Sequence, residues 1–303
     1  MNGHVGVVLV LSFILALWLV RPSRLRLKLD PSRQVALPAG HRKAVGWRWA
    51  GLVTGVVVAA STSAVGPLGL GLMLSPTVFG LCVIGGVVVA ELTTMPRFEG
   101  VRTAALETRT VGDYLPARLG GLVTGSTIGL GALLATTTLM GSADHMGLAG
   151  RSLSRSCSPV YSAVTGPWPG LFWSVPLGIA VAVGLLGTVL ALRVVVLRPP
   201  SGWAPDLVAA VDDLRCRAAE AVVAAAGVMV AAPVFAVAFL AGGRLVGFSC
   251  APPSWIVLGI MLLAVSALML VVSGGCLVLL LVGPRLRPVE SADTPVAGQA
   301  VRQ

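Results

Sequence analysis

The sequence predicts an all-α fold: a polytopic transmembrane helical bundle of seven spans, with the N-terminus outside and the C-terminus in the cytoplasm. Two observations predict it. Hydrophobic residues make up 56% of the 303 residues and charged residues only 11%, a composition outside the range of soluble domains. The Lys and Arg residues fall in alternate loops between the apolar runs, and this alternation sets the orientation of membrane proteins.

Seven apolar runs are long enough for spans, because a helix needs about 20 apolar residues to cross the bilayer core. They lie near residues 3–20, 49–66, 70–92, 119–141, 170–196, 218–241 and 255–283. Gly66-Pro67 predicts a turn between the second and third runs. The first run has no Lys or Arg before it and no small-residue cleavage pattern before Arg21. We therefore expect a retained anchor and not a cleaved signal peptide.

The positive charges give the orientation. Of the 22 Lys and Arg residues, 19 fall in four segments that this topology places in the cytoplasm, residues 21–48, 97–118, 193–217 and 285–302. The other three, Arg151, Arg155 and Arg244, fall in outer loops. Basic loops that face an anionic inner leaflet account for the net charge of +10. We therefore expect a multi-pass plasma-membrane protein whose partner is the lipid bilayer, with no nucleic acid.

The chain divides into four parts. Residues 1–20 form the N-terminal anchor, 21–48 a basic cytoplasmic segment, 49–283 a six-helix bundle of three hairpins, and 284–303 a cytoplasmic tail expected to be disordered. Residues 48–55 and 118–125 are identical at six of eight positions. Either a hairpin repeat or chance accounts for this match, since Gly, Leu, Val and Thr are abundant here.

Glycines at helical spacing predict close helix packing. The G-x-x-x-G pairs are Gly51 with Gly55 and Gly121 with Gly125, and Gly129 extends the second pair by another turn. Small residues at this spacing let a neighbouring backbone approach closely. The neighbour belongs either to the same chain or to a second copy, so the homo-oligomeric state stays open. Inside the expected spans, Pro76, Pro176 and Pro233 are expected to kink their helices.

Charged residues avoid the middle of the expected spans. Glu91 and Glu220 come closest, at the cytoplasmic ends of the third and sixth spans, and Arg217 lies one turn before Glu220. Ionisable groups within a membrane mark functional sites by default. Two interpretations of this cytoplasmic-side polar site stay open: interfacial carboxylates paired with arginines, or a cation or proton gate.

No catalytic or metal-ligand pattern is recognisable. His4, His41 and His145 all fall in loops, and no His, Cys or carboxylate residues cluster at ligand spacing. We therefore predict no catalytic residue, no metal and no cofactor, and a protein that is not an enzyme.

The five cysteines divide by compartment. Cys82 and Cys276 fall inside spans and Cys216 faces the cytoplasm, whereas Cys157 and Cys250 occupy two different outer loops. The outer face is the oxidising one. The sequence therefore predicts a disulfide between Cys157 and Cys250.

Two short motifs carry a resemblance. Gly112-Asp113-Tyr114-Leu115-Pro116 and Gly166-Pro167-Trp168-Pro169-Gly170, together with the seven-span pattern and the excess of Arg over Lys, resemble uncharacterised multi-pass integral membrane proteins of actinobacteria. The resemblance implies a membrane bundle but no activity. Rhodopsins and G-protein-coupled receptors share the span count, but the last span here has no Lys, so that analogy rests on count alone.

Two function classes follow. The first is a non-enzymatic accessory or scaffold protein that docks a membrane or cytoplasmic protein partner through its basic loops. The alternative is a small-solute transporter or permease subunit that works with a partner. The absence of a charge at the midplane of the expected spans disfavours proton- or sodium-coupled transport.

The orientation can be tested with a reporter fusion. An enzyme that is active only outside the cytoplasmic membrane, fused after Gln303, is expected to be inactive because the basic loops retain that end in the cytoplasm. The same reporter inserted after Pro159 is expected to be active. Activity of the Gln303 fusion would contradict the orientation.

Overall fold

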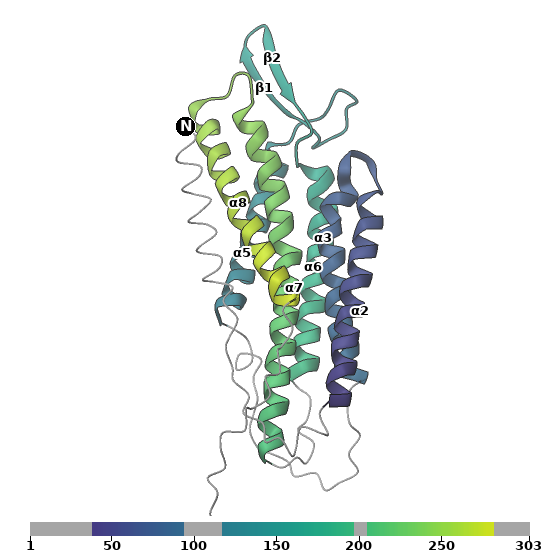
Figure 1. Ribbon diagram of the computed structural model, residues 1–303. Helices are drawn as coiled ribbons and strands as arrows, with labels where there is room; N and C mark the ends of the chain where they lie inside the picture. Colours follow the sequence, from purple (N-terminus) through teal and green to yellow (C-terminus); the bar gives the residue numbers. More distant parts are fainter. Residues whose placement is uncertain (1–37, 94–116, 197–204, 282–303) are drawn as a thin grey trace, which may run out of the picture.

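The computed structural model describes residues 38–93, 117–196 and 205–281. These ranges form six α-helices, one short 3₁₀ helix and one β-hairpin. In chain order the elements are α2 (Pro38–Ser63), η2 (Pro67–Gly69), α3 (Leu70–Thr93), α5 (Ala117–Met140), β1 (Leu153–Ser158), β2 (Tyr161–Thr165), α6 (Leu171–Val196), α7 (Pro205–Val246) and α8 (Pro253–Leu281). The hairpin lies at one end of the bundle (Figure 1), here called the hairpin end.

Five helices are long and apolar enough to cross a membrane, which indicates a membrane-embedded protein. They are residues 67–93, 117–140, 171–196, 215–246 and 253–281, and they coincide with five of the seven predicted runs. The predicted run at 3–20 lies outside the described residues. The run at 49–66 belongs to α2, which is not among these five helices. Its apolar part is preceded by Arg42, Lys43 and Arg48 and followed by Ser61-Thr62-Ser63, which lowers its mean hydropathy.

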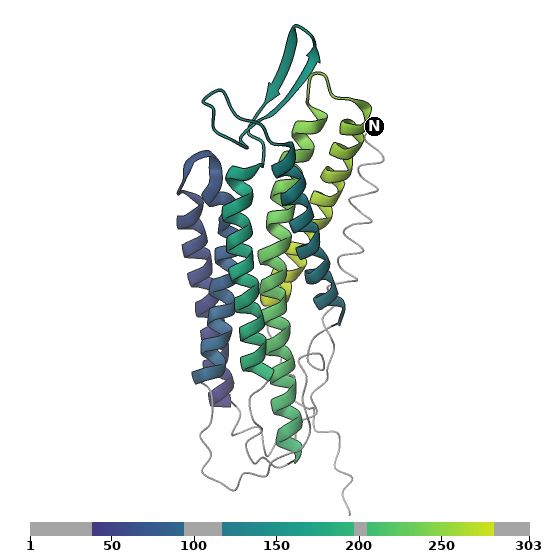
Figure 2. The ribbon, with the colours of Figure 1, turned by 180° about the vertical axis from the view of Figure 1, so that it is seen from behind.

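Helix α7 forms the axis of the bundle. It is the longest helix, with 42 residues, and it projects beyond the others at the end opposite the hairpin (Figures 1 and 2). Helices α3, α5, α6 and α8 all pack on it, while α2 packs along α3 at the edge. Each candidate span contains an apolar stretch of 18 residues. In α7, 78% of this stretch is buried inside the protein, compared with 17% to 39% in the other four spans.

Small side chains explain how one helix can be surrounded. The buried face of α7 is rich in Ala, and Ala224, Ala225, Ala226 and Ala231 are all fully buried. Such residues let neighbouring backbones approach closely, which is how helices associate in a membrane. Helices α5 and α6 pack more extensively on α7 than on each other.

Glycines on α3 and α6 make room for one side chain of α7. Met229 is fully buried. A Cβ added to Gly80 of α3 would lie 2.8 Å from the Cβ of Met229, and one added to Gly184 of α6 would overlap the Met229 sulfur. Three helices therefore meet at Met229, and the two flanking ones have no side chain there.

A second close crossing joins α7 to α8. A Cβ on Gly242 would lie 2.8 Å from the carbonyl oxygen of Gly259, and a Cβ on Gly259 would lie 2.9 Å from the carbonyl oxygen of Gly242. Nearer the other end of α8, a Cβ on Gly227 would lie 2.6 Å from the sulfur of Cys276. Helix α8 is thus held along α7 at two levels.

The segment between α5 and α6, expected to be a loop, contains the β-hairpin. Its strands are antiparallel, with Leu153 opposite Thr165 and Ser156 opposite Ser162. Leu153 and Ala163 are buried, whereas Ser154 and Val164 are exposed, which is the alternation expected of a strand with one covered face. This pattern is short and Ser-rich, so its apolar period is weak in the sequence.

The α7–α8 crossing can be tested by a pair of neighbouring substitutions. Gly242→Ala is expected to lower the stability of the purified protein by about 1–3 kcal/mol, the usual cost of overpacking, because the added Cβ meets the backbone of α8. Gly243→Ala is the matched control, since no described atom lies within 4 Å of its Cβ and Ala is the better helix former. Thermal unfolding in detergent measures both, and equal melting temperatures would contradict the crossing.

Candidate functional site

The predicted polar site lies at the end of the bundle opposite the hairpin. Glu91, in the last turn of α3, is buried with 8% of its surface exposed. Arg48 of α2 interacts electrostatically with Glu91, because α2 and α3 cross closely enough for Gly51 to contact Gly86. On α7, the Nη1 atom of Arg217 lies 3.6 Å from the Oε2 atom of Glu220, one helical turn away.

This geometry matches one of the two interpretations of the site. Each carboxylate interacts with an arginine near the end of the bundle, as interfacial ion pairs do. The sequence did not connect Glu91 with Arg48, which it counted only among the charges that set the orientation. It also missed Arg215, which is buried with 3% of its surface exposed. A gating role for these residues stays a prediction.

The two glycine motifs have different surroundings. A Cβ on Gly51 would lie 3.0 Å from the Cα of Gly86, and one on Gly55 would lie 3.0 Å from the Phe79 ring, so the first motif contacts α3. For Gly121, Gly125 and Gly129 of α5, no described atom lies within 4 Å of the added Cβ. Residues 48–55 and 118–125 are similar in sequence, but within the described residues their glycines have different neighbours.

A second structured region covers the hairpin end. We call residues 141–170 and 247–252 the cap. Cys157 of β1 and Cys250 of the α7–α8 turn are joined as a disulfide, with their Cα atoms 5.9 Å apart. This disulfide does not involve Cys82, Cys216 or Cys276. The disulfide therefore ties the hairpin to the end of the central helix.

An apolar cluster lies beneath the hairpin. Leu153, Ala163 and Trp168 pack against Ala241 and Leu245 of α7 and Phe248 of the α7–α8 turn. Trp168 is fully buried, and its indole Nε1 donates a hydrogen bond to the carbonyl oxygen of Thr137 at 2.8 Å. Trp168 therefore lies inside this cluster and links the cap to α5.

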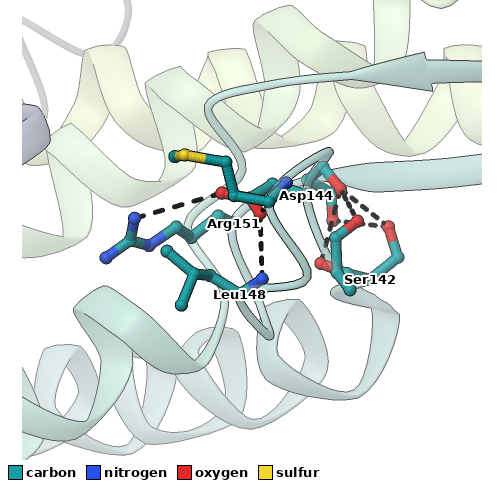
Figure 3. Close-up of polar contacts among 7 residues, drawn as sticks. Ser142, Asp144, Leu148 and Arg151 are labelled. Carbon is teal, nitrogen blue, oxygen red and sulfur yellow. Dashed lines mark hydrogen bonds and ion pairs between the residues drawn. The ribbon is translucent and has the colours of Figure 1, made fainter.

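Two arginines of the cap have aromatic partners in the helices of the bundle. The guanidinium carbon of Arg155 lies 5.0 Å from the ring centroid of Trp255, and that of Arg151 lies 4.2 Å from the ring centroid of Phe172. Cations at this distance are attracted by the aromatic ring. Arg151 also lies 4.0 Å from the Oδ2 atom of Asp144 (Figure 3). These contacts hold the two arginines of the cap against the bundle.

Asp144 organises the loop that leads into the hairpin. Its Oδ1 atom accepts hydrogen bonds from the backbone amides of Leu148 and Met146, both at 2.9 Å (Figure 3). The Leu148 amide is the main cause that lowers the pKa of the Asp144 carboxyl. Partial burial opposes this effect, and the Met146 amide, His145 and Arg151 add to it. Asp144 is therefore ionised at neutral pH and acts as a structural acceptor.

The described residues contain no group of three or more His, Cys, Asp or Glu side chains that could hold a metal ion. The contacts at the cap and at the opposite end hold helices and loops together. The chain matches no protein-family model, no curated protein and no solved structure.

The disulfide can be tested by counting thiols. In the denatured, unreduced protein we expect three reactive cysteines, and five after reduction, because only Cys157 and Cys250 are paired. Cys157→Ser is expected to expose the thiol of Cys250 and to destabilise the cap, since losing a native disulfide typically costs about 2–5 kcal/mol. Cys82→Ser is the matched control and leaves the pair intact. An unchanged thiol count on reduction would contradict the pairing.

Proposed function

We propose that this protein is a non-enzymatic accessory or scaffold protein of the plasma membrane. It spans the membrane seven times with its N-terminus outside, holds the cap on the outer face and presents its basic loops to a cytoplasmic or membrane partner. The position of α7 supports this proposal most directly, because 78% of the apolar stretch of this helix is buried inside the protein. A helix packed on four sides fills the axis that a solute would otherwise use.

The hydroxyl groups of the spans also support this proposal. Thr127, Thr137 and Thr188 donate to carbonyl oxygens of their own helices, at 2.8, 2.9 and 2.8 Å. Such bonds satisfy hydroxyls inside a helix at little cost. Groups used in this way are not arranged to replace the hydration shell of a passing solute.

The distribution of charge supports the orientation. In their helices, Lys43, Arg48, Arg118, Arg193 and Arg217 lie in the half that points away from the hairpin. The disulfide lies at the opposite end, within the cap. Basic residues at a cytoplasmic face and a disulfide at an oxidising face are the expected arrangement.

The cap gives the scaffold a fixed outer surface. The disulfide, the Trp168 hydrogen bond and the two arginine–aromatic contacts hold it to the bundle. At the turn of the hairpin, Val160 is 97% exposed and Tyr161 is 57% exposed. Exposed apolar groups on a rigid support are typical of protein contact surfaces.

The permease alternative rests on the prolines inside α3, α6 and α7. Because α7 occupies the axis, a solute path would have to run between this chain and a partner. That requirement separates the two classes experimentally.

Reconstitution distinguishes the two functions. Liposomes that contain the purified full chain alone are expected to take up a panel of small solutes no faster than empty liposomes. In cells, a photocrosslinking amino acid at Val160 is expected to yield a discrete protein adduct. The same amino acid at Ile179, a 62% exposed position on α6, is the matched control and is expected to yield none. Solute uptake by the chain alone would overturn the scaffold proposal.

A further inference from the structure

One buried hydroxyl in the bundle is not used by its own helix. Thr77 of α3 is fully buried, and its Oγ1 atom has no hydrogen-bond partner among the described residues. Buried Thr137 and Thr188 instead bond to carbonyl oxygens four residues earlier. A buried hydroxyl without a partner is unfavourable and calls for an explanation.

Helix periodicity shows which elements surround Thr77. A Cβ on Gly80 would lie 3.1 Å from the carbonyl oxygen of Ala225 in α7. The side chain of Leu81 lies against Gly187 of α6, at 3.7 Å from a Cβ added there. At about 100° per residue, Thr77 lies between the directions of Gly80 and Leu81. Its side chain therefore faces the seam where α3, α6 and α7 meet.

The same periodicity identifies the group opposite Thr77. Helices α3 and α7 run in opposite directions (Figure 1). One turn back from Gly80 on α3 therefore corresponds to one turn forward from Ala225 on α7. This step leads from Gly80 to Thr77 on one helix and from Ala225 to Met229 on the other. Thr77 is thus level with the carbonyl of Met229.

The Met229 carbonyl has lost its usual helical donor. The residue four positions later is Pro233, a buried proline inside α7, which has no N–H to donate. In α3, a carbonyl that a proline has left without its helical donor receives a hydrogen bond from a side chain instead. Pro76 deprives Leu72 of its donor, and the Ser75 hydroxyl donates to the Leu72 carbonyl at 2.9 Å.

We propose that the Thr77 hydroxyl and the Met229 carbonyl together bind one water molecule at the centre of the bundle. The water donates to the carbonyl and accepts from the hydroxyl, so it satisfies both groups and links α3 to α7. Buried waters occur where polar groups of this kind converge, and in membrane helices ordered waters satisfy carbonyls freed by proline. This inference is independent of the proposed function.

A double-mutant cycle tests the water bridge. Thr77→Val keeps the shape of the side chain and removes the hydroxyl, so it is expected to lower the melting temperature. Thr77→Ser keeps the hydroxyl and is expected to melt close to the unsubstituted protein. Pro233→Ala restores an N–H for the Met229 carbonyl. In that background the loss caused by Thr77→Val is expected to shrink. Thr188→Val is the control, because the Thr188 hydroxyl already bonds within its helix, and it is expected to be additive with Pro233→Ala.

Two results would overturn the bridge. One is a Thr77→Val protein that melts at the same or a higher temperature, as expected if the hydroxyl is simply unsatisfied. The other is full additivity between Thr77→Val and Pro233→Ala. Radiolytic footprinting supplies a direct readout, since hydroxyl radicals formed from a bound water oxidise the nearest reactive side chain. Fully buried Met229 is expected to be oxidised in the native protein and protected in Thr77→Val, and equal oxidation in both would also contradict the bridge.

Discussion

The close approach of four helices to α7 is the interaction on which the rest of the bundle depends. Lipid is as apolar as the helix surfaces, so association within a membrane depends on packing distance and polar contacts. In this protein the distance is set where side chains are missing, at Gly80 and Gly184 around Met229 and at Gly242 against Gly259. A residue with a Cβ at these points would push a neighbouring helix away from the axis.

Outside the bundle a different constraint holds the cap. Water surrounds this region in the proposed topology, so burial of Leu153, Ala163 and Trp168 is favourable in its own right. The disulfide then restricts the hairpin to the end of α7. Arg155 completes the arrangement by covering the ring of Trp255. The result is an outer surface whose position is fixed by the central helix.

Sequence reasoning reached parts of both regions. It paired Cys157 with Cys250 because both fall in outer loops, and that pairing is confirmed by the geometry. It named Glu91 but not Arg48, since the link between them depends on how α2 crosses α3. It gave Gly51 and Gly121 the same role, yet only the first has a described neighbour. The spacing of glycines along one helix shows that one face carries no large side chains, but it does not show which helix packs against that face.

Composition and period alone determined that this is a helical membrane protein, and they located five of its spans, because an apolar helix of sufficient length has few alternatives in a bilayer. Charge alternation gave a testable orientation, because basic loops are retained on the cytoplasmic side. Only the tertiary structure decided that α7 is the axis, that Trp168 is buried in the cap, and that Thr77 faces α7. These facts depend on contacts between residues far apart in the chain, and periodicity within one helix carries no information about them.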